Sequence, residues 1–92
     1  MWHLFFIQVN IFKKGHKLLE AEIAAYPKNI EYRFLRLAVQ EHAPNLLKYN
    51  KNIDEDKALI IANYNALNSA LKEQIDDYAK QSNILKPWDL KD

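Results

Sequence analysis

Arg33 and Arg36 form the polar pair in this sequence with the clearest chemical use. Residues three apart share one face of a helix, so the two guanidinium groups would lie side by side. Such a pair presents planar forks of N–H donors that match a carboxylate or a phosphate. The sequence therefore offers one candidate anion-binding site. The alternative is that both arginines pair with acids of the same chain, with Glu55 and Asp56 as the expected partners.

The three histidines, His3, His16 and His42, do not form a metal-binding pattern. A helical zinc site needs two histidines three or four residues apart, and no two here have that spacing. His16 falls on an otherwise apolar stripe, as either a proton switch or an imidazole at the edge of the core. The lack of cysteine removes thiolate ligands, thiol catalysis and disulfides. We expect no metal and no cofactor.

The acidic residues and the serines do not assemble a catalytic pattern. The run from Asp54 to Asp56 fails as a calcium loop, because Ala58 stands at its fifth position and no glycine at its sixth. Asp76 and Asp77 are adjacent, so a helix would point them to different sides. Neither serine lies on a tight glycine turn of the kind that presents a nucleophile. We predict that the protein is not an enzyme.

Composition indicates one helical domain spanning residues 1–92. The chain is 49% hydrophobic, enough to fold, and its single glycine and three prolines are too few for a turn-rich β fold. Thirteen basic and twelve acidic residues give a net charge of +1, which disfavours nucleic acid as a partner. The apolar opening MWHLFFIQV is shorter than the roughly twenty residues of a membrane-spanning helix.

The elements that must position these residues are read from apolar spacing. A stripe at alternating intervals of three and four predicts a first helix over about residues 2–26, with Gly15 as the place where it would break. Pro27 ends this helix, and Asn29 caps a second one over about residues 30–42. The first stripe comprises Trp2, Phe5, Val9, Phe12, His16, Leu19, Ile23 and Tyr26; the second helix would bury Tyr32, Leu35, Val39 and His42, with Phe34 and Ala38 beside them.

A third helix is predicted over about residues 54–81. Either Asn52, in a capping box with Glu55, or Asp54, after the staple residue Ile53, would begin it. The remaining residues 83–92 are predicted to form a non-helical tail. The third stripe comprises Ile60, Tyr64, Leu67, Leu71, Ile75 and Tyr78. Three helices with one stripe each bury those stripes against one another, which predicts an all-α, three-helix up-down-up bundle.

The stretch from residue 14 to residue 40 resembles the junction between tetratricopeptide repeats. In that family an alanine-rich turn leads through proline and asparagine into the next helix, and residues 24–32 read AAYPKNIEY. The resemblance implies tetratricopeptide-like packing of the first two helices. A single copy does not imply the family's peptide-binding groove, because stacked repeats need about three units for stability. The run EYRFLRL with the residues after it is also similar to short uncharacterised bacterial proteins, which imply no function.

Both ends of the chain are rich in large apolar side chains. Trp2, Phe5 and Phe6 crowd one end and Trp88 the other. Tryptophan and phenylalanine are favoured anchors of interfaces, so these four residues are candidate interface residues; the alternative is that the tail folds back and covers the bundle.

We expect a non-catalytic protein–protein interaction or scaffolding module that self-associates or docks to another protein through the first helix and the tail. Two alternatives stay open. One is a small anion-binding protein that uses Arg33 and Arg36. The other is an envelope-associated protein whose natural N-terminus is longer than Met1. The sequence leaves the compartment open between the cytoplasm and, if such a longer N-terminus exists, the periplasm.

Overall fold

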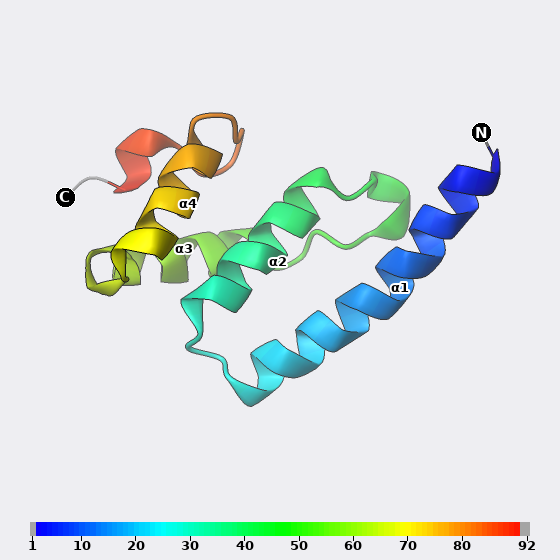
Figure 1. Cartoon of the computed structure of the whole chain (residues 1–92), viewed down its shortest axis with the longest axis horizontal. Coiled ribbons are helices and arrows are strands. Elements are labelled where there is room, and N and C mark those ends of the chain that lie inside the picture. Colours follow the sequence, from blue (N-terminus) through cyan, green and yellow to red (C-terminus); the bar gives the residue numbers. More distant parts are fainter. Residues whose placement is uncertain (1, 91–92) are drawn as a thin grey trace.

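The computed structural model describes the backbone of residues 2–90 and the side chains of residues 14–90. Within this range every regular element is helical, which confirms the all-α prediction. This part of the chain contains four α-helices rather than the three expected, and Figure 1 shows their arrangement. The elements are α1 (Trp2–Ala25), α2 (Ile30–His42), the 3-10 turn η1 (Asn45–Leu47), α3 (Ile53–Asn63), the 3-10 turn η2 (Tyr64–Ala66), α4 (Ser69–Ala79) and the 3-10 turn η3 (Pro87–Leu90).

Helices α1 and α2 form the hairpin that the sequence predicts, and they run antiparallel (Figure 1). Helix α1 passes through Gly15 without a break. Nothing lies within 4 Å of where a Cβ would stand, so no close approach requires a glycine here. Helix α2 has the predicted bounds, and the Asn29 side chain caps it by accepting a hydrogen bond from the Tyr32 N–H at 3.0 Å. The tetratricopeptide-like packing of the pair stays a prediction.

The predicted single helix over residues 54–81 is wrong, because it is two helices with a break between them. Helix α3 ends at Asn63, whose side-chain amide donates to the Leu59 carbonyl at 2.8 Å. The turn η2 follows, Leu67 is extended, and Asn68 then caps α4 by accepting from the Leu71 N–H at 2.8 Å. The apolar stripe continues across the break because both helices face the same core.

The predicted non-helical tail is wrong in part, because its last described residues form the 3-10 turn η3. Leu85 is fully buried and Leu90 is nearly so. Asp89 accepts a hydrogen bond from the Lys86 backbone N–H and pairs with Lys57 of α3 at 3.3 Å. The tail therefore folds back onto α3 and α4, which was the alternative to an open interface at this end.

The face of α2 that is buried differs from the predicted one. Its buried residues are Ile30, Arg33, Arg36, Leu37 and Gln40, whereas Leu35 is 50% exposed. The prediction ranked faces by hydrophobicity alone. The polar residues go inside because each finds a hydrogen-bond partner there, which lowers the cost of burying them.

Helix α2 lies in the middle of the molecule, with α1 on one side and α3 and α4 on the other (Figure 1). Its packing against α3 is the most extensive between any two elements, and its contact with α1 is smaller. The core residues come from α2, α3, α4 and the tail: Ile30, Leu37, Ile60, Leu71, Ile75, Ala79, Leu85 and Leu90. Ile23 is the one buried residue among the described side chains of α1, and it lies outside this cluster.

Candidate functional site

Arg33 and Arg36 meet at Asp56, a carboxylate of α3 with no exposed surface. Arg36 binds it through two parallel bonds, with Nε 2.7 Å from Oδ2 and Nη2 2.8 Å from Oδ1. Arg33 donates from Nη1 to Oδ1 at 3.0 Å. Burial opposes the charge on Arg36, but the hydrogen bond to Asp56 outweighs it and raises the pKa of the guanidinium. Arg36 is therefore a cation held by a buried carboxylate.

The two arginines make further polar contacts inside the protein. Arg36 donates from Nη1 to Glu20 Oε1 of α1 at 2.8 Å. Arg33 donates from Nε to the Pro27 carbonyl at 3.0 Å and forms an ion pair with Glu55 at 3.3 Å. The pairing with Glu55 and Asp56 expected from the sequence is thus present. An anion from solution would have to displace one of these carboxylates to reach the site.

The cluster holds three helices and a loop together, and sequence reasoning missed two of its members. Glu20 also accepts a hydrogen bond from the Tyr49 hydroxyl, which lies in the loop after η1. Burial, followed by this bond, raises the pKa of Tyr49. His16 of α1 stacks at a tilt on the Tyr49 ring, with centroids 5.2 Å apart. Glu20 and Tyr49 are separated by 29 residues, so no local pattern could have joined them.

A second polar cluster joins α2 to the end of α4. The Glu41 carboxylate accepts from the Tyr78 hydroxyl at 2.7 Å, the Ser82 hydroxyl at 2.6 Å and the Asn83 N–H at 2.7 Å. Burial alone would raise the pKa of Glu41, but these hydrogen bonds outweigh it and lower the pKa. Glu41 is therefore a fixed negative charge at this edge of the molecule.

Beside this cluster is a hollow of about 490 Å³ between α2 and α4, which we call the α2–α4 groove. The ring of Phe34 meets the Tyr78 ring edge-on, with centroids 5.3 Å apart and planes at 86°. His42 meets the same tyrosine at 6.1 Å and 88°. The residues that line the groove are Phe34 and His42 of α2, Gln74, Asp77 and Tyr78 of α4, and Gln81 and Ser82 after α4.

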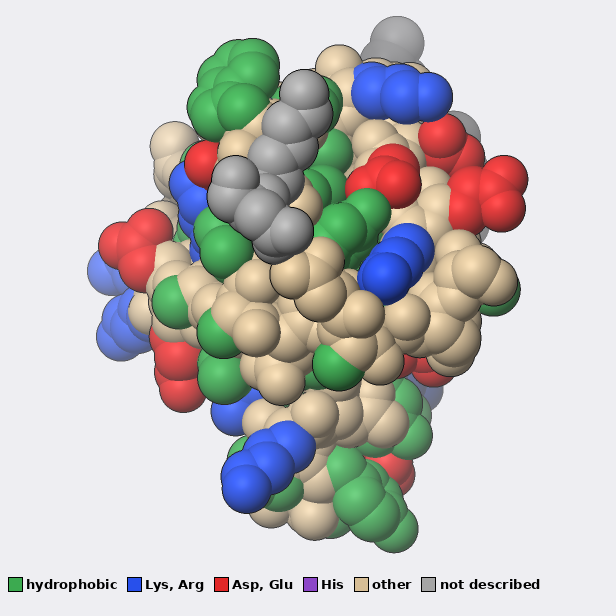
Figure 2. Space-filling model, turned by 90° about the vertical axis from the view of Figure 1, so that its left-hand side faces the viewer, with side chains coloured by type: hydrophobic (Ala, Val, Ile, Leu, Met, Phe, Trp, Pro, Cys, Tyr) green, Lys and Arg blue, Asp and Glu red, His purple; other side chains and the backbone are tan. Residues whose placement is uncertain are grey.

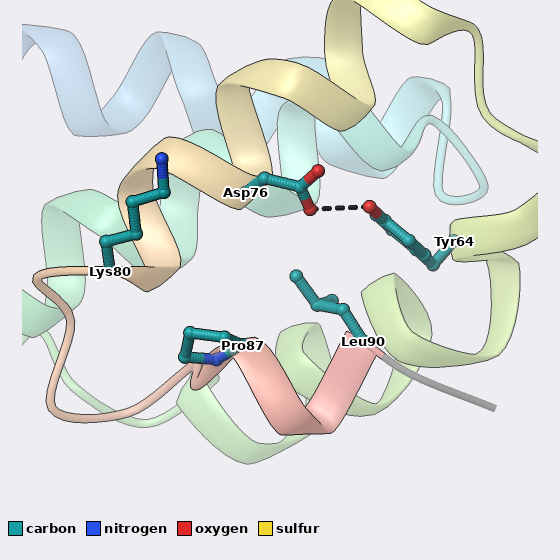
Figure 3. Close-up of a pocket in the computed structure, with 5 residues that line it drawn as sticks. All are labelled: Tyr64, Asp76, Lys80, Pro87 and Leu90. Carbon is teal, nitrogen blue, oxygen red and sulfur yellow. Dashed lines mark hydrogen bonds between the residues drawn. The ribbon is translucent and has the colours of Figure 1, made fainter.

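A smaller hollow of about 270 Å³ lies between α4, η2 and η3 (Figure 3). The Tyr64 hydroxyl donates to Asp76 across one side, and this bond raises the pKa of Tyr64. Lys80 extends away from that pair, and Pro87 and Leu90 form the opposite, apolar wall (Figure 3). This hollow is also smaller than the α2–α4 groove.

The candidate interface residues fall partly outside what the structure describes. The side chains of Trp2, Phe5 and Phe6 are not among the described ones. Trp88 is 69% exposed on η3, with the Lys86 ammonium 6.0 Å from its ring centroid. Other exposed large hydrophobic residues are Leu18, Tyr26, Leu35, Ile61 and Leu46.

Within the described residues, no group of three or more metal-ligating side chains gathers at one place, and no helix has the length and hydropathy to cross a membrane. Acidic and basic side chains are interspersed on the face formed by the left-hand side of Figure 1 (Figure 2). This face therefore carries no single-sign charged surface of the kind that binds nucleic acid.

Comparison with known proteins identifies no relative. No protein-family model matches the sequence. No curated protein and no solved structure gives a significant match.

Proposed function

We propose that the protein is a non-catalytic helical interaction module that binds a second copy of its own chain through the outer face of α2. We define this outer face as Tyr32, Leu35 and Val39 of α2, together with Tyr26 at the end of α1. The residues of α2 recur at intervals of three and four, so they lie on one side of the helix. The Tyr26 and Tyr32 rings are in contact, with centroids 6.4 Å apart, which joins α1 to the patch.

The observation that carries the proposal is that α2 is apolar on two sides. One side enters the core through Ile30 and Leu37, and the other leaves Leu35 50% exposed. A surface helix of a globular protein typically carries polar residues on the face opposite its apolar stripe. Tyr26, which is 59% exposed, adds an aromatic ring of the kind that anchors interfaces.

The polar clusters support a role without chemistry. Arg33 and Arg36 both donate to Asp56, and the carboxylate of Glu41 accepts from the Tyr78 hydroxyl. No buried side-chain nitrogen or oxygen among the described residues lacks a hydrogen-bond partner. Groups used in this way stabilise the fold and are not free to activate a substrate.

Light scattering coupled to size-exclusion chromatography tests the proposal. We expect the mass of the wild-type protein to rise above that of a monomer with concentration, and Leu35→Asp to remain monomeric because it buries a charge in the interface. Leu46→Asp is the matched control, since Leu46 is 81% exposed in η1, away from the outer face. Trp88→Asp, on η3, is expected to leave the measured mass unchanged, which distinguishes the outer face of α2 from an interface at η3. A wild-type protein that stays monomeric at high concentration, unchanged by Leu35→Asp, contradicts the proposal.

A further inference from the structure

The α2–α4 groove has a second aromatic surface, separate from the outer face of α2. Phe34 and Tyr78 stand nearly perpendicular, at 86°, and form a corner that is only partly buried. The faces of aromatic rings carry negative charge density and attract cations that approach within about 6 Å. A corner of two rings therefore favours a flat or alkylated cation over a neutral group of the same size.

Two acidic side chains lie at or next to the corner, together with the imidazole of His42. Asp77 and His42 line the groove, and Glu41 accepts hydrogen bonds from the lining residues Tyr78 and Ser82. No lysine or arginine is among the described lining residues. Lys80 pairs with Asp77 at 3.3 Å, but both side chains are at least 65% exposed. A surface pair of this kind contributes little energy, so a better-placed cation can replace the lysine.

Polar residues of α4 and of the turn after it are placed to orient such a cation. Gln74, Asp77 and Tyr78 share one face of α4, and Gln81, which follows the end of the helix at Ala79, lines the same groove. They offer a carboxylate and two amide oxygens beside an aromatic face. A guanidinium has five donors in one plane and stacks on aromatic rings, whereas an ammonium is a compact, strongly hydrated charge.

We propose that the α2–α4 groove binds an arginine side chain of a partner peptide, with the guanidinium stacked against Phe34 and Tyr78 and hydrogen-bonded to Asp77. The volume of about 490 Å³ is within the range of small-ligand sites, and its open shape leaves room for the backbone on either side of the arginine. This site does not depend on the self-association proposed above, because it faces α4 and not the outer side of α2.

Nuclear magnetic resonance titration with N-acetyl-arginine methylamide tests the site. We expect saturable shifts of the ring resonances of Phe34, His42 and Tyr78. The same titration with the citrulline analogue, which has the shape of arginine without its charge, is expected to give no saturable shift. The lysine analogue and tetramethylammonium are expected to bind several times more weakly, because they lack the planar donors.

Two neighbouring acids provide the matched variants. Asp77→Asn is expected to weaken binding about fivefold, the upper range for one exposed ion pair. Asp76→Asn, which removes the acid bonded to Tyr64, is expected to leave it unchanged. Phe34→Leu should remove the contribution of the Phe34 ring to the binding affinity. Because Phe34 packs against the core, this variant could also change folding. Asp77→Asn, at an exposed position, tests the site independently of folding. Equal binding of citrulline, tighter binding of lysine or tetramethylammonium, shifts centred elsewhere, or equal effects of the two aspartate variants would each overturn the assignment.

Discussion

At the scale of single residues, Asp56 is the side chain on which most others depend. It has no exposed surface, and its two oxygens accept three hydrogen bonds from two arginines. A buried carboxylate costs several kcal/mol in lost hydration, and only close counter-charges offset that cost. Burial of the carboxylate is therefore offset while the arginines are paired with it. Removing either the carboxylate or the guanidinium groups leaves an uncompensated charge inside the protein.

The first prediction follows from this dependence. Asp56→Asn keeps the size of the side chain but removes the negative charge that faces both guanidinium groups. We expect the free energy of unfolding to fall by about 3 kcal/mol, a large share of the total for a domain of this size. Urea denaturation followed by circular dichroism measures the change.

Asp54→Asn is the matched control, because Asp54 is exposed in the first turn of α3. The free energy of unfolding of this variant is expected to stay within about 0.5 kcal/mol of the wild-type value. If the two variants lost the same stability, Asp56 would carry no special electrostatic role.

At the scale of elements, the residues that begin and end helices were more informative than the apolar stripes. Pro27 and Asn29 located the first turn correctly, since a proline ring and an N-cap act locally. The break between α3 and α4 depends on the same chemistry, with Asn68 capping α4. This break was missed in the sequence because the apolar stripe from Ile60 to Tyr78 is uninterrupted, and Asn63 and Asn68 were given too little weight.

The candidate site was predictable only where partners lie close in the sequence or share a helix face. Arg33 and Arg36 were found because they are three apart, and their partners Glu55 and Asp56 because they open the next helix. The groove was not found, because its corner joins Phe34 and Tyr78 across 44 positions of the chain. Contacts over that distance depend on how helices pack, which no local spacing records.

Helix α1 is expected to open more readily than the rest of the molecule. Its described part buries only Ile23, and Glu20 supplies its charged contacts to Arg36 and Tyr49. The second prediction is that Glu20→Ala speeds hydrogen exchange of the amides of residues 14–25 and leaves α3 and α4 protected. Alanine is the better helix former, so faster exchange would report lost docking and not a weaker helix. Mass spectrometry of exchanged fragments measures it.

Lys17→Ala, at an exposed position of the same helix, is the control and should leave exchange unchanged. Exchange that rises equally in α1, α3 and α4 after Glu20→Ala would contradict the idea that α1 opens by itself.

At the scale of the whole molecule, the carboxylates set how stability depends on pH. Hydrogen bonds to Glu41 outweigh its burial and lower its pKa, and bonds from Asn52 and Arg33 lower that of Glu55. The Lys86 backbone N–H and Lys57 lower the pKa of Asp89. A group with a lowered pKa in the folded state is protonated first in the unfolded chain, which favours unfolding in acid.

The third prediction is therefore that the free energy of unfolding is constant near neutral pH and falls as the pH drops below the ordinary glutamate value of 4.5. Glu41→Gln should lower stability at neutral pH and make the fall in acid shallower, because its contribution is already lost. Denaturant titrations at a series of pH values measure both. Glu73→Gln, at an exposed position, is the control and should keep the wild-type dependence of the free energy of unfolding on pH in acid. If Glu41→Gln showed that same dependence, the prediction would be contradicted.

The buried ion cluster also determines how α2 can align with α3. Sliding α2 along its axis by one turn would set Leu37 and Gln40 opposite Asp56 in place of Arg33 and Arg36. The carboxylate would then face a hydrocarbon and an uncharged amide, at a cost of several kcal/mol. Hydrophobic contacts alone tolerate such slippage, whereas three directed bonds to one carboxylate do not. Asp56 thus selects a single register for the two helices, and it excludes shifted alignments that leucines and isoleucines would accept.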